Sequence, residues 1–360
     1  MGEIMKIRLV IGEQDKRYLN HLLMFLERNY MDKLEIVSFS DPSLFAAYFE
    51  KGTADVILID EGFGVSQAAV AQKGMTALLT ESQSEGSDGL RRILKYKKPD
   101  LIYKDIVDLY AETGSYGGLG GSSHSSGRQG NLVMVTGFSG GTGASTFAAA
   151  LARKYALRGE KTLYLDLEDT GSSADFFQGY GEYCFDDIIF ALKSRRTDVR
   201  LKMESAVCTD PSGVYFYRPC TSALYMKELT KEDIFKALDA VVSLNSYAHV
   251  VVNVNFHLSP DFLELMSMMN RIILVQDGGE TSNTKFVRTM EGIRILETQT
   301  GRNVIPSMML LYNKFSSSKS SSEITDLHIP VIGTIPPIKH ALVKEIINYI
   351  LTQDEIFERL

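Results

Sequence analysis

The chain has 360 residues, of which 44% are apolar and 23% charged, and its formal net charge is −7 at neutral pH. This length and composition are typical of a globular protein with one large domain or two, and the negative charge argues against non-specific binding to nucleic acid. No apolar run is long enough to cross a bilayer, and residues 1–30 lack the apolar core of a signal peptide. The sequence therefore predicts a cytoplasmic protein without a transmembrane segment.

The clearest boundary in the chain is a segment rich in glycine and serine, Thr113–Gly130. A segment with so few apolar residues is typical of a flexible linker. It predicts a first domain of residues 1–112 and a second of residues 131–360, and both lengths fall within the usual range of domain sizes.

In the first domain, short apolar segments alternate with stretches of helical periodicity. This alternation predicts an α/β fold with a doubly wound, parallel sheet, in which functional residues lie at the carboxyl ends of the strands. The expected strands are Lys6–Ile11, Leu34–Phe39, Val56–Ile59, Thr76–Leu79 and Leu101–Tyr103.

Polar residues follow three of these strands, because Asp60, Thr80 and Lys104 come directly after the third, fourth and fifth. This order resembles the receiver domain of two-component response regulators, which has a flavodoxin-like fold. The resemblance implies that Asp60 accepts phosphate and that Thr80 and Lys104 contact the phosphoryl group. Where the family has a magnesium-binding acidic pair, this chain has Gly12 and Glu13, and fewer carboxylates bind magnesium more weakly. The alternative is a receiver-shaped docking module that is never phosphorylated.

The second domain opens with an apolar segment, a glycine-rich loop and a helical segment, at residues 132–135, 137–146 and 147–155. In this order they predict a phosphate cradle, in which backbone N–H groups converge on an anion at a helix N-terminus. Ser145 occupies the position whose hydroxyl binds magnesium in P-loop proteins. The alternative is a glycine-rich turn without a ligand, because Ala144 stands where the strict pattern has lysine. The candidate binding residues are Ser139, Gly140, Gly141, Thr142, Gly143, Ala144, Ser145 and Thr146.

Later strands end in further polar landmarks. They are Asp166-Leu-Glu168 after residues 161–165, Asn313-Lys314 after residues 308–312, and the segment VIGTIPP at residues 331–337. Together with the loop, these landmarks resemble the MinD/ParA family of P-loop ATPases, with a mostly parallel sheet, across nearly all of residues 131–360.

The resemblance implies that the second domain binds ATP and Mg²⁺. Ser145 and Asp166 would be the metal ligands, and Asp166 and Glu168 would face the magnesium and the attacking water as catalytic carboxylates. The adenine base would be bordered by Asn313, Lys314, Pro336 and Pro337.

Three departures from the family weaken the expected catalysis. Ser139 stands in place of the signature lysine, Ala144 in place of the lysine that pairs with the phosphates, and Asn253 in place of the Walker B aspartate. Losing one such group costs roughly 10²–10³ in rate, because phosphoryl transfer depends on neutralising developing charge. The sequence therefore predicts a deviant Walker A motif that binds nucleotide and is at most a weak ATPase.

The lysine-free loop GGTGAST behind a receiver-like domain resembles the TadZ/CpaE branch of the MinD/ParA family, which localises components of Flp/Tad-type pilus assembly. The resemblance implies an ATP-bound homodimer that recruits pilus or secretion assembly proteins at a cell pole or at the inner membrane face. Two alternatives stay open. One is a cycling ATPase of the MinD/ParA kind, with Lys314 or a partner's arginine supplying the missing cation, and the other is a switch controlled by phosphorylation of Asp60.

Overall fold

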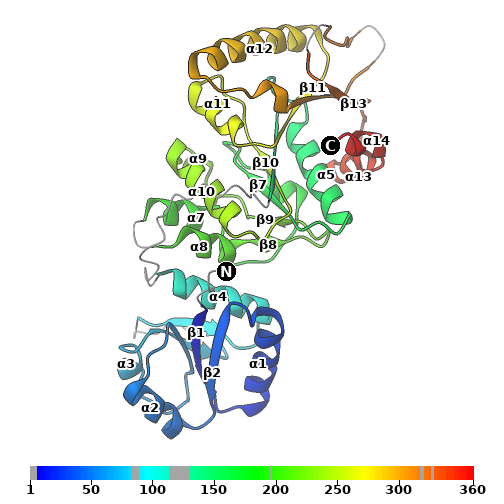
Figure 1. The fold of residues 1–360 in the computed structure, drawn as a ribbon. Coiled ribbons are helices and arrows are strands. Elements are labelled where there is room, and N and C mark those ends of the chain that lie inside the picture. The colour runs from blue at the N-terminus through cyan, green and yellow to red at the C-terminus, as the bar shows by residue number, and fades with distance from the viewer. Residues whose placement is uncertain (1–5, 83–88, 113–129, 195–196, 317–319, 326–327) are drawn as a thin grey trace. The chain divides into compact units, whose positions relative to one another are not determined.

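The computed structural model describes residues 6–82, 89–112, 130–194, 197–316, 320–325 and 328–360 (Figure 1). The chain divides into two compact units: unit 1 comprises residues 1–121 and 194–205, and unit 2 comprises residues 122–193 and 206–360. The expected linker, Thr113–Gly130, lies outside the described residues except for Gly130. Among the described helices, none combines the length and the apolarity that crossing a membrane requires.

Unit 1 is built on a sheet of five parallel strands in the order β2-β1-β3-β4-β5, so the expected doubly wound fold is confirmed. The strands β1, β3 and β4 are almost entirely buried, as expected for parallel strands with helices on both faces. The strands are β1 Ile7–Gly12, β2 Leu34–Phe39, β3 Val56–Asp60, β4 Met75–Thr80 and β5 Arg91–Leu94.

The helices of unit 1 cover both faces of its sheet. One core contains side chains of α1 (Lys16–Tyr30) and α4 (Pro99–Glu112), and the other contains side chains of α2 (Pro42–Lys51) and the single turn α3 (Gln67–Val70). Asp15 and Asp41 cap α1 and α2, because each carboxylate accepts hydrogen bonds from two backbone N–H groups of the first turn.

The expectation of a fifth strand at Leu101–Tyr103 is wrong. These residues lie inside α4, and the fifth strand is Arg91–Leu94. A short apolar segment fits a buried helix as well as a strand, whereas the true edge strand has two arginines and only two apolar residues. The strand end therefore carries Lys95 rather than Lys104.

Unit 2 contains an eight-stranded sheet in the order β13-β12-β11-β6-β10-β7-β9-β8. Every neighbouring pair in it is parallel except β8 with β9. The strands are β6 Asn131–Thr136, β7 Thr162–Asp166, β8 Cys208–Thr209, β9 Tyr215–Phe216, β10 His249–Asn253, β11 Arg271–Gln276, β12 Met308–Asn313 and β13 Val331–Ile335.

The helix α5 (Ala144–Leu157) lies in the core of unit 2, where residues 147–152 are fully buried. Four of these six residues are alanines, and such small side chains let the helix backbone approach the sheet closely. The same core includes side chains of α13 (Val343–Leu351) and α14 (Asp354–Glu358), so the C-terminal segment packs on its own unit. The remaining helices of unit 2 are α6 Ser173–Phe176, α7 Phe185–Lys193, α9 Ala223–Met226, α10 Lys231–Ser243, α11 Pro260–Ser267, α12 Glu280–Thr300 and the 3-10 turn η1 Ile305–Ser307. The helix α8 (Val199–Ala206) belongs to unit 1 except for its last residue.

Candidate nucleotide-binding site

The loop between β6 and α5 has the backbone shape of a phosphate cradle. Gly141 and Gly143 adopt left-handed φ angles of 76° and 87°, which glycine accepts readily. A Cβ on Gly143 would lie 2.4 Å from Nδ2 of Asn313, whereas no atom of the described residues lies within 4 Å of a Cβ on Gly140 or Gly141. The loop is therefore packed tightly on one side and open on the other, so an anion could approach its backbone.

The start of α5 leaves its own donors available. Gly143 is the N-cap residue, and none of the described side chains caps the helix there. The first N–H groups of a helix have no intrahelical partner and carry the positive end of the helix dipole. Within the described chain, the buried hydroxyls of Ser139 and Thr142 also have no hydrogen-bond partner. Buried orphan polar groups at an open helix N-terminus fit a phosphate group.

The end of β12 braces this loop from the packed side. Nδ2 of Asn313 donates to the carbonyl of Thr142 at 2.7 Å, and Nζ of Lys314 donates to the carbonyl of Gly141 at 2.7 Å. Lys314 adopts a left-handed φ of 56°, which is costly for a residue with a Cβ. The hydrogen bond from its amine to the loop backbone accompanies this conformation.

The expected adenine-binding segment reaches the same edge of the sheet. Pro336 and Pro337 directly follow β13 and are exposed. The N–H of Phe315 donates to the carbonyl of Ile335 at 2.9 Å, which ties the two strand ends together. The candidate residues Asn313, Lys314, Pro336 and Pro337 thus lie on neighbouring parallel strand ends, while Thr146 lies in the first turn of α5.

Two carboxylates lie at the end of β7 beside the loop, Asp166 as its last residue and Glu168 two residues later. Oε1 of Glu168 accepts a hydrogen bond from the hydroxyl of Ser145 at 2.8 Å. Oδ1 of Asp166 accepts from the N–H of Glu168 and from Nδ2 of Asn253, and its Oδ2 accepts from the N–H of Ser172. The structure therefore joins Ser145 to Glu168 directly, and it surrounds Asp166 with neutral donors.

These surroundings raise the pKa of Asp166. Although part of the residue reaches solvent, desolvation raises the pKa of Asp166 to about 6, and the backbone N–H of Ser172 opposes that rise. The amide of Asn253 is fully buried where a Walker B carboxylate is expected, so it donates to Asp166 instead of adding a second negative charge. Near neutral pH the carboxylate is charged and is able to bind a cation.

The residues at the two missing-lysine positions carry no charge. Ser139 lies in the loop with its hydroxyl buried, and Ala144 is the first residue of α5 and packs partly against the core. Lys314, the expected substitute, donates to a loop carbonyl. The described side chains therefore offer oxygen ligands for a metal ion beside the cradle. The amine of Lys314, however, is hydrogen-bonded to the loop backbone.

Unit 1 carries a second polar cluster at its strand ends. Nζ of Lys95 contacts Oε2 of Glu13 at 2.8 Å and Oδ1 of Asp60 at 2.5 Å, and the hydroxyl of Thr80 is buried without a partner in the described part of the chain. Burial lowers the pKa of Lys95, but hydrogen bonds with Asp60 and Glu13 outweigh it, so the net shift is upward. Asp60 and Thr80 thus lie where the sequence places them, at the ends of β3 and β4.

The expectation that Lys104 belongs to this cluster is wrong. Lys104 lies within α4, not at a strand end, whereas Lys95 directly follows β5 and makes the contact with Asp60. The signal that could have found Lys95 is its position after the apolar pair of Ile93 and Leu94, a pattern too short to be recognised as a strand without neighbours.

Comparisons with known proteins agree with this architecture. The family model of the TadZ-like receiver domain matches residues 5–111, and that of the CobQ/CobB/MinD/ParA nucleotide binding domain matches residues 133–344. Among curated proteins, the septum site-determining protein MinD of Neisseria meningitidis serogroup B is 23% identical over 228 residues, which cover 59% of this chain and 80% of that protein.

Two solved structures are similar to this chain at low sequence identity. The cell division ATPase MinD of Pyrococcus furiosus is 14% identical, with a TM-score of 0.47, and the match covers 64% of this chain and 99% of that one. A putative plasmid partition protein of Borrelia burgdorferi B31 bound to AMPPNP is 13% identical, with a TM-score of 0.46, and the match covers 63% and 97%.

Proposed function

The chain belongs to the CobQ/CobB/MinD/ParA nucleotide-binding family and carries a TadZ-like receiver domain, and from this premise we propose that it is an ATP-binding localisation factor with very slow or absent hydrolysis. The proposed domain division is residues 1–112, a linker of 113–130, and residues 131–360. The observation that supports the proposal best is a backbone cradle without a lysine in its loop, in which the hydroxyls of Ser139 and Thr142 have no partner within the described chain.

In the proposed complex, different groups of the chain bind the phosphates, the magnesium ion and the base. The N–H groups from Gly140 to Ala144 donate to phosphate oxygens, and the hydroxyls of Ser139, Ser145 and Thr146 add to them. Ser145 and Asp166 hold Mg²⁺, which neutralises phosphate charge when it is bound. Asn313, Lys314, Pro336 and Pro337 border the base.

The charges of the described site favour slow hydrolysis. Glu168 is the carboxylate proposed to face the attacking water, but in the described structure it accepts hydrogen bonds from the hydroxyls of Ser145 and Ser172. With Asn253 in place of a carboxylate and Lys314 on a loop carbonyl, the described site has few groups to neutralise charge that develops in phosphoryl transfer. Backbone donors remain, so binding suffers less than turnover.

We further propose that bound ATP stabilises an isologous homodimer, which recruits pilus or secretion assembly proteins at a cell pole or at the inner membrane face. This part of the proposal is supported by the TadZ-like receiver domain and its order before the nucleotide-binding domain. It does not invoke nucleic acid, and the net charge of −7 agrees with that.

A second candidate function is phosphorylation of Asp60. The specific observation in its favour is the cluster of Asp60, Lys95 and the orphaned hydroxyl of Thr80 at neighbouring strand ends of the described chain. Labelling of the purified protein by a small phosphodonor such as acetyl phosphate, lost in Asp60→Ala, would support it. Absence of label would leave unit 1 as a docking module.

The main proposal is tested by following radiolabelled ATP on ligand-free protein with Mg²⁺, with molar mass measured in parallel. Retention of intact ATP by a dimer is the expected result. Conversion to ADP over many turnovers, abolished in Asp166→Ala, would instead establish a cycling ATPase. No binding at millimolar ATP would refute both.

A further inference from the structure

The helix α4 of unit 1 is covered on more than one side. All of its residues from Ile102 to Ala111 are buried except Lys104, including the carboxylates of Asp105 and Asp108. A helix on the outside of a sheet normally buries one stripe and leaves polar residues in water. The sheet explains one buried face of α4, so a second element must cover the other.

That element comes from far along the chain. Residues 194–205 belong to unit 1, although they follow α7 and precede β8, both of which belong to unit 2. They include α8 up to Ser205. The side chain of Leu201 packs against the core shared by α1 and α4, and the N–H of Asp198 approaches the carbonyl of Ala111 at 3.4 Å.

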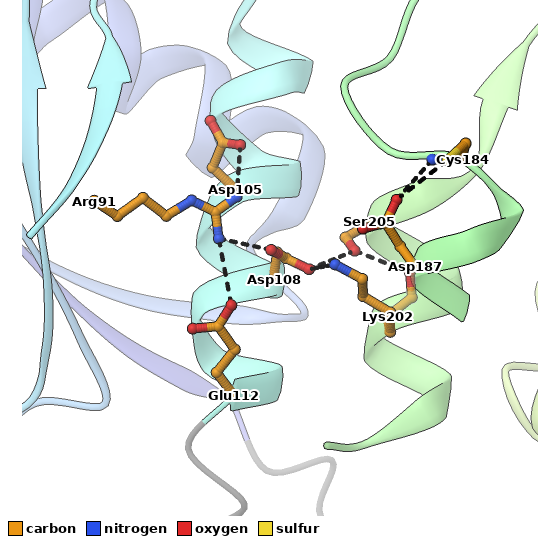
Figure 2. Close-up of polar contacts among 8 residues, drawn as sticks. All are labelled: Arg91, Asp105, Asp108, Glu112, Cys184, Asp187, Lys202 and Ser205. Carbon is orange, nitrogen blue, oxygen red and sulfur yellow. Dashed lines mark hydrogen bonds and ion pairs between the residues drawn. The ribbon is translucent and has the colours of Figure 1, made fainter. Parts of the chain in front are cut away.

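A buried carboxylate forms the centre of this contact. Oδ1 of Asp108 accepts from Nζ of Lys202 at 2.6 Å and from the hydroxyl of Ser205 at 3.3 Å, while its Oδ2 accepts from Arg91 at 2.6 Å (Figure 2). Only 2% of the Asp108 side chain and 12% of the Lys202 side chain are exposed. Arg91 also lies within ion-pair distance of Asp105 and Glu112, at 3.6 and 3.8 Å, so its charge is shared among three carboxylates. Lys202 thus supplies Asp108 with a second cation.

A second polar contact lies nearby on the same face. Oε1 of Glu204 accepts from the hydroxyl of Tyr103 at 2.9 Å and pairs with Lys33. The ring of Tyr103 stacks on Tyr30 at 3.5 Å between centroids, which fixes the hydroxyl in place. On this segment, Lys202 faces the anionic Asp108 and Glu204 faces the cationic Lys33. Two ion pairs of opposite polarity specify one register of the segment.

We propose that residues 198–205 are an intrachain docking segment for the α4 face of unit 1, and that they hold unit 1 to the rest of the chain independently of residues 113–130. While the segment is seated, the α4 face is closed to other proteins. This docking does not depend on nucleotide binding.

The test uses the full-length chain with a recognition site for a sequence-specific protease placed within residues 113–129. After cleavage of the folded protein, the N-terminal fragment is expected to stay with the remainder through gel filtration at micromolar concentration. If the two wild-type fragments separate there, the proposal is wrong.

Two sets of variants decide whether the named contacts hold the fragments together. Lys202→Glu places a second carboxylate against buried Asp108 and is expected to raise the fragment Kd by about 10²-fold, and Lys202→Met, which adds no charge, by about tenfold or more. Lys33→Glu and Glu204→Lys should each weaken retention, and combining them should restore it to within a few-fold.

The matched control is Lys231→Glu in α10, which breaks an exposed ion pair with Asp261 and Glu264 and should leave retention unchanged. Urea unfolding of each uncleaved variant checks that it still folds. Retention that is insensitive to both Lys202 variants would overturn the proposal, because another contact would then hold the fragments.

Discussion

At the residue scale, the phosphate loop depends on the missing side chain of Gly143. Alanine there would adopt a left-handed φ, at a cost of about 1–2 kcal/mol, and its Cβ would displace the amide of Asn313. We expect Gly143→Ala to lower ATP affinity by at least about tenfold, since roughly 1.4 kcal/mol of loop distortion is enough. Isothermal titration calorimetry measures it.

Gly159→Ala is the matched control for this variant. Gly159 follows α5 with a φ of 80°, and in the described structure no atom lies within 4 Å of the position that a Cβ would take there. It should lose only the cost of the left-handed φ, about 1–2 kcal/mol in urea, and it should bind ATP like the wild type. Equal ATP affinity in the two variants would show that the close approach to Asn313 does not shape the loop.

Asp166 should make stability depend on pH in an unusual direction. Its pKa is about 6 in the folded protein and about 4 in an unfolded chain, so between these values the folded state holds more protons. Its contribution to the free energy of unfolding is therefore greatest at low pH and falls as pH rises from about 4 to 6, by about 2–3 kcal/mol. Urea titrations of wild type and Asp166→Asn at several pH values measure the difference.

The pH-dependent difference between these two proteins is diagnostic, because other groups titrate equally in both. In Asp166→Asn, the new amide also faces the N–H of Ser172, which adds a cost that does not change with pH. If the difference in unfolding free energy between wild type and Asp166→Asn stayed constant from about pH 4 to 7, Asp166 would have an ordinary pKa.

At the scale of elements, the end of β12 is a brace for the loop before α5. Asn313→Ala would remove the donor to the Thr142 carbonyl, at a cost of about 1–3 kcal/mol for the buried group left unpaired. If bracing is the main role of Asn313, affinities for ATP and GTP should fall by the same factor. If Asn313 contacts adenine, preference for ATP over GTP should disappear as well, and competition with both nucleotides separates these outcomes.

In unit 1, one amine joins the ends of β1, β3 and β5. Lys95→Met would leave the buried Glu13 and the partly buried Asp60 without their cation, and we expect a loss of about 3–5 kcal/mol in unfolding free energy. The exposed Lys16 at the start of α1 provides the control variant Lys16→Met. A similar small loss in both variants would contradict the central role of Lys95.

At the scale of the whole molecule, the sequence predicts most of the architecture because strands and helices differ in periodicity. The first four strands of unit 1 and the loop before α5 follow directly from apolar segments and glycines. Prediction fails at Leu101–Tyr103, because three apolar residues fit a helix or a strand equally, and the sequence therefore points to Lys104 in place of Lys95. The pairing of Lys202 with Asp108 could not be predicted, because the two residues are 94 positions apart and only the packing of α8 on α4 brings them together.

The lifetime of the proposed dimer should depend on the missing lysine. If hydrolysis is very slow, the rate of ATP release determines the lifetime of the dimer. The dimer would then persist at its site and would not dissociate after each hydrolysis cycle. Ala144→Lys, at the first residue of α5, would return a cation to the phosphate site and should raise turnover by at least about tenfold, within the range that one such group supplies. Faster turnover should shorten the dimer lifetime in parallel.

Ala144→Met introduces a long apolar side chain without charge, so it separates the effect of the cation from that of bulk. Phosphate release and subunit exchange between two differently labelled pools, measured in the same samples, test the link. Faster turnover with unchanged exchange would mean that hydrolysis does not control dissociation. In that case the dimer would be held by protein contacts, and bound ATP would serve only to order the loop.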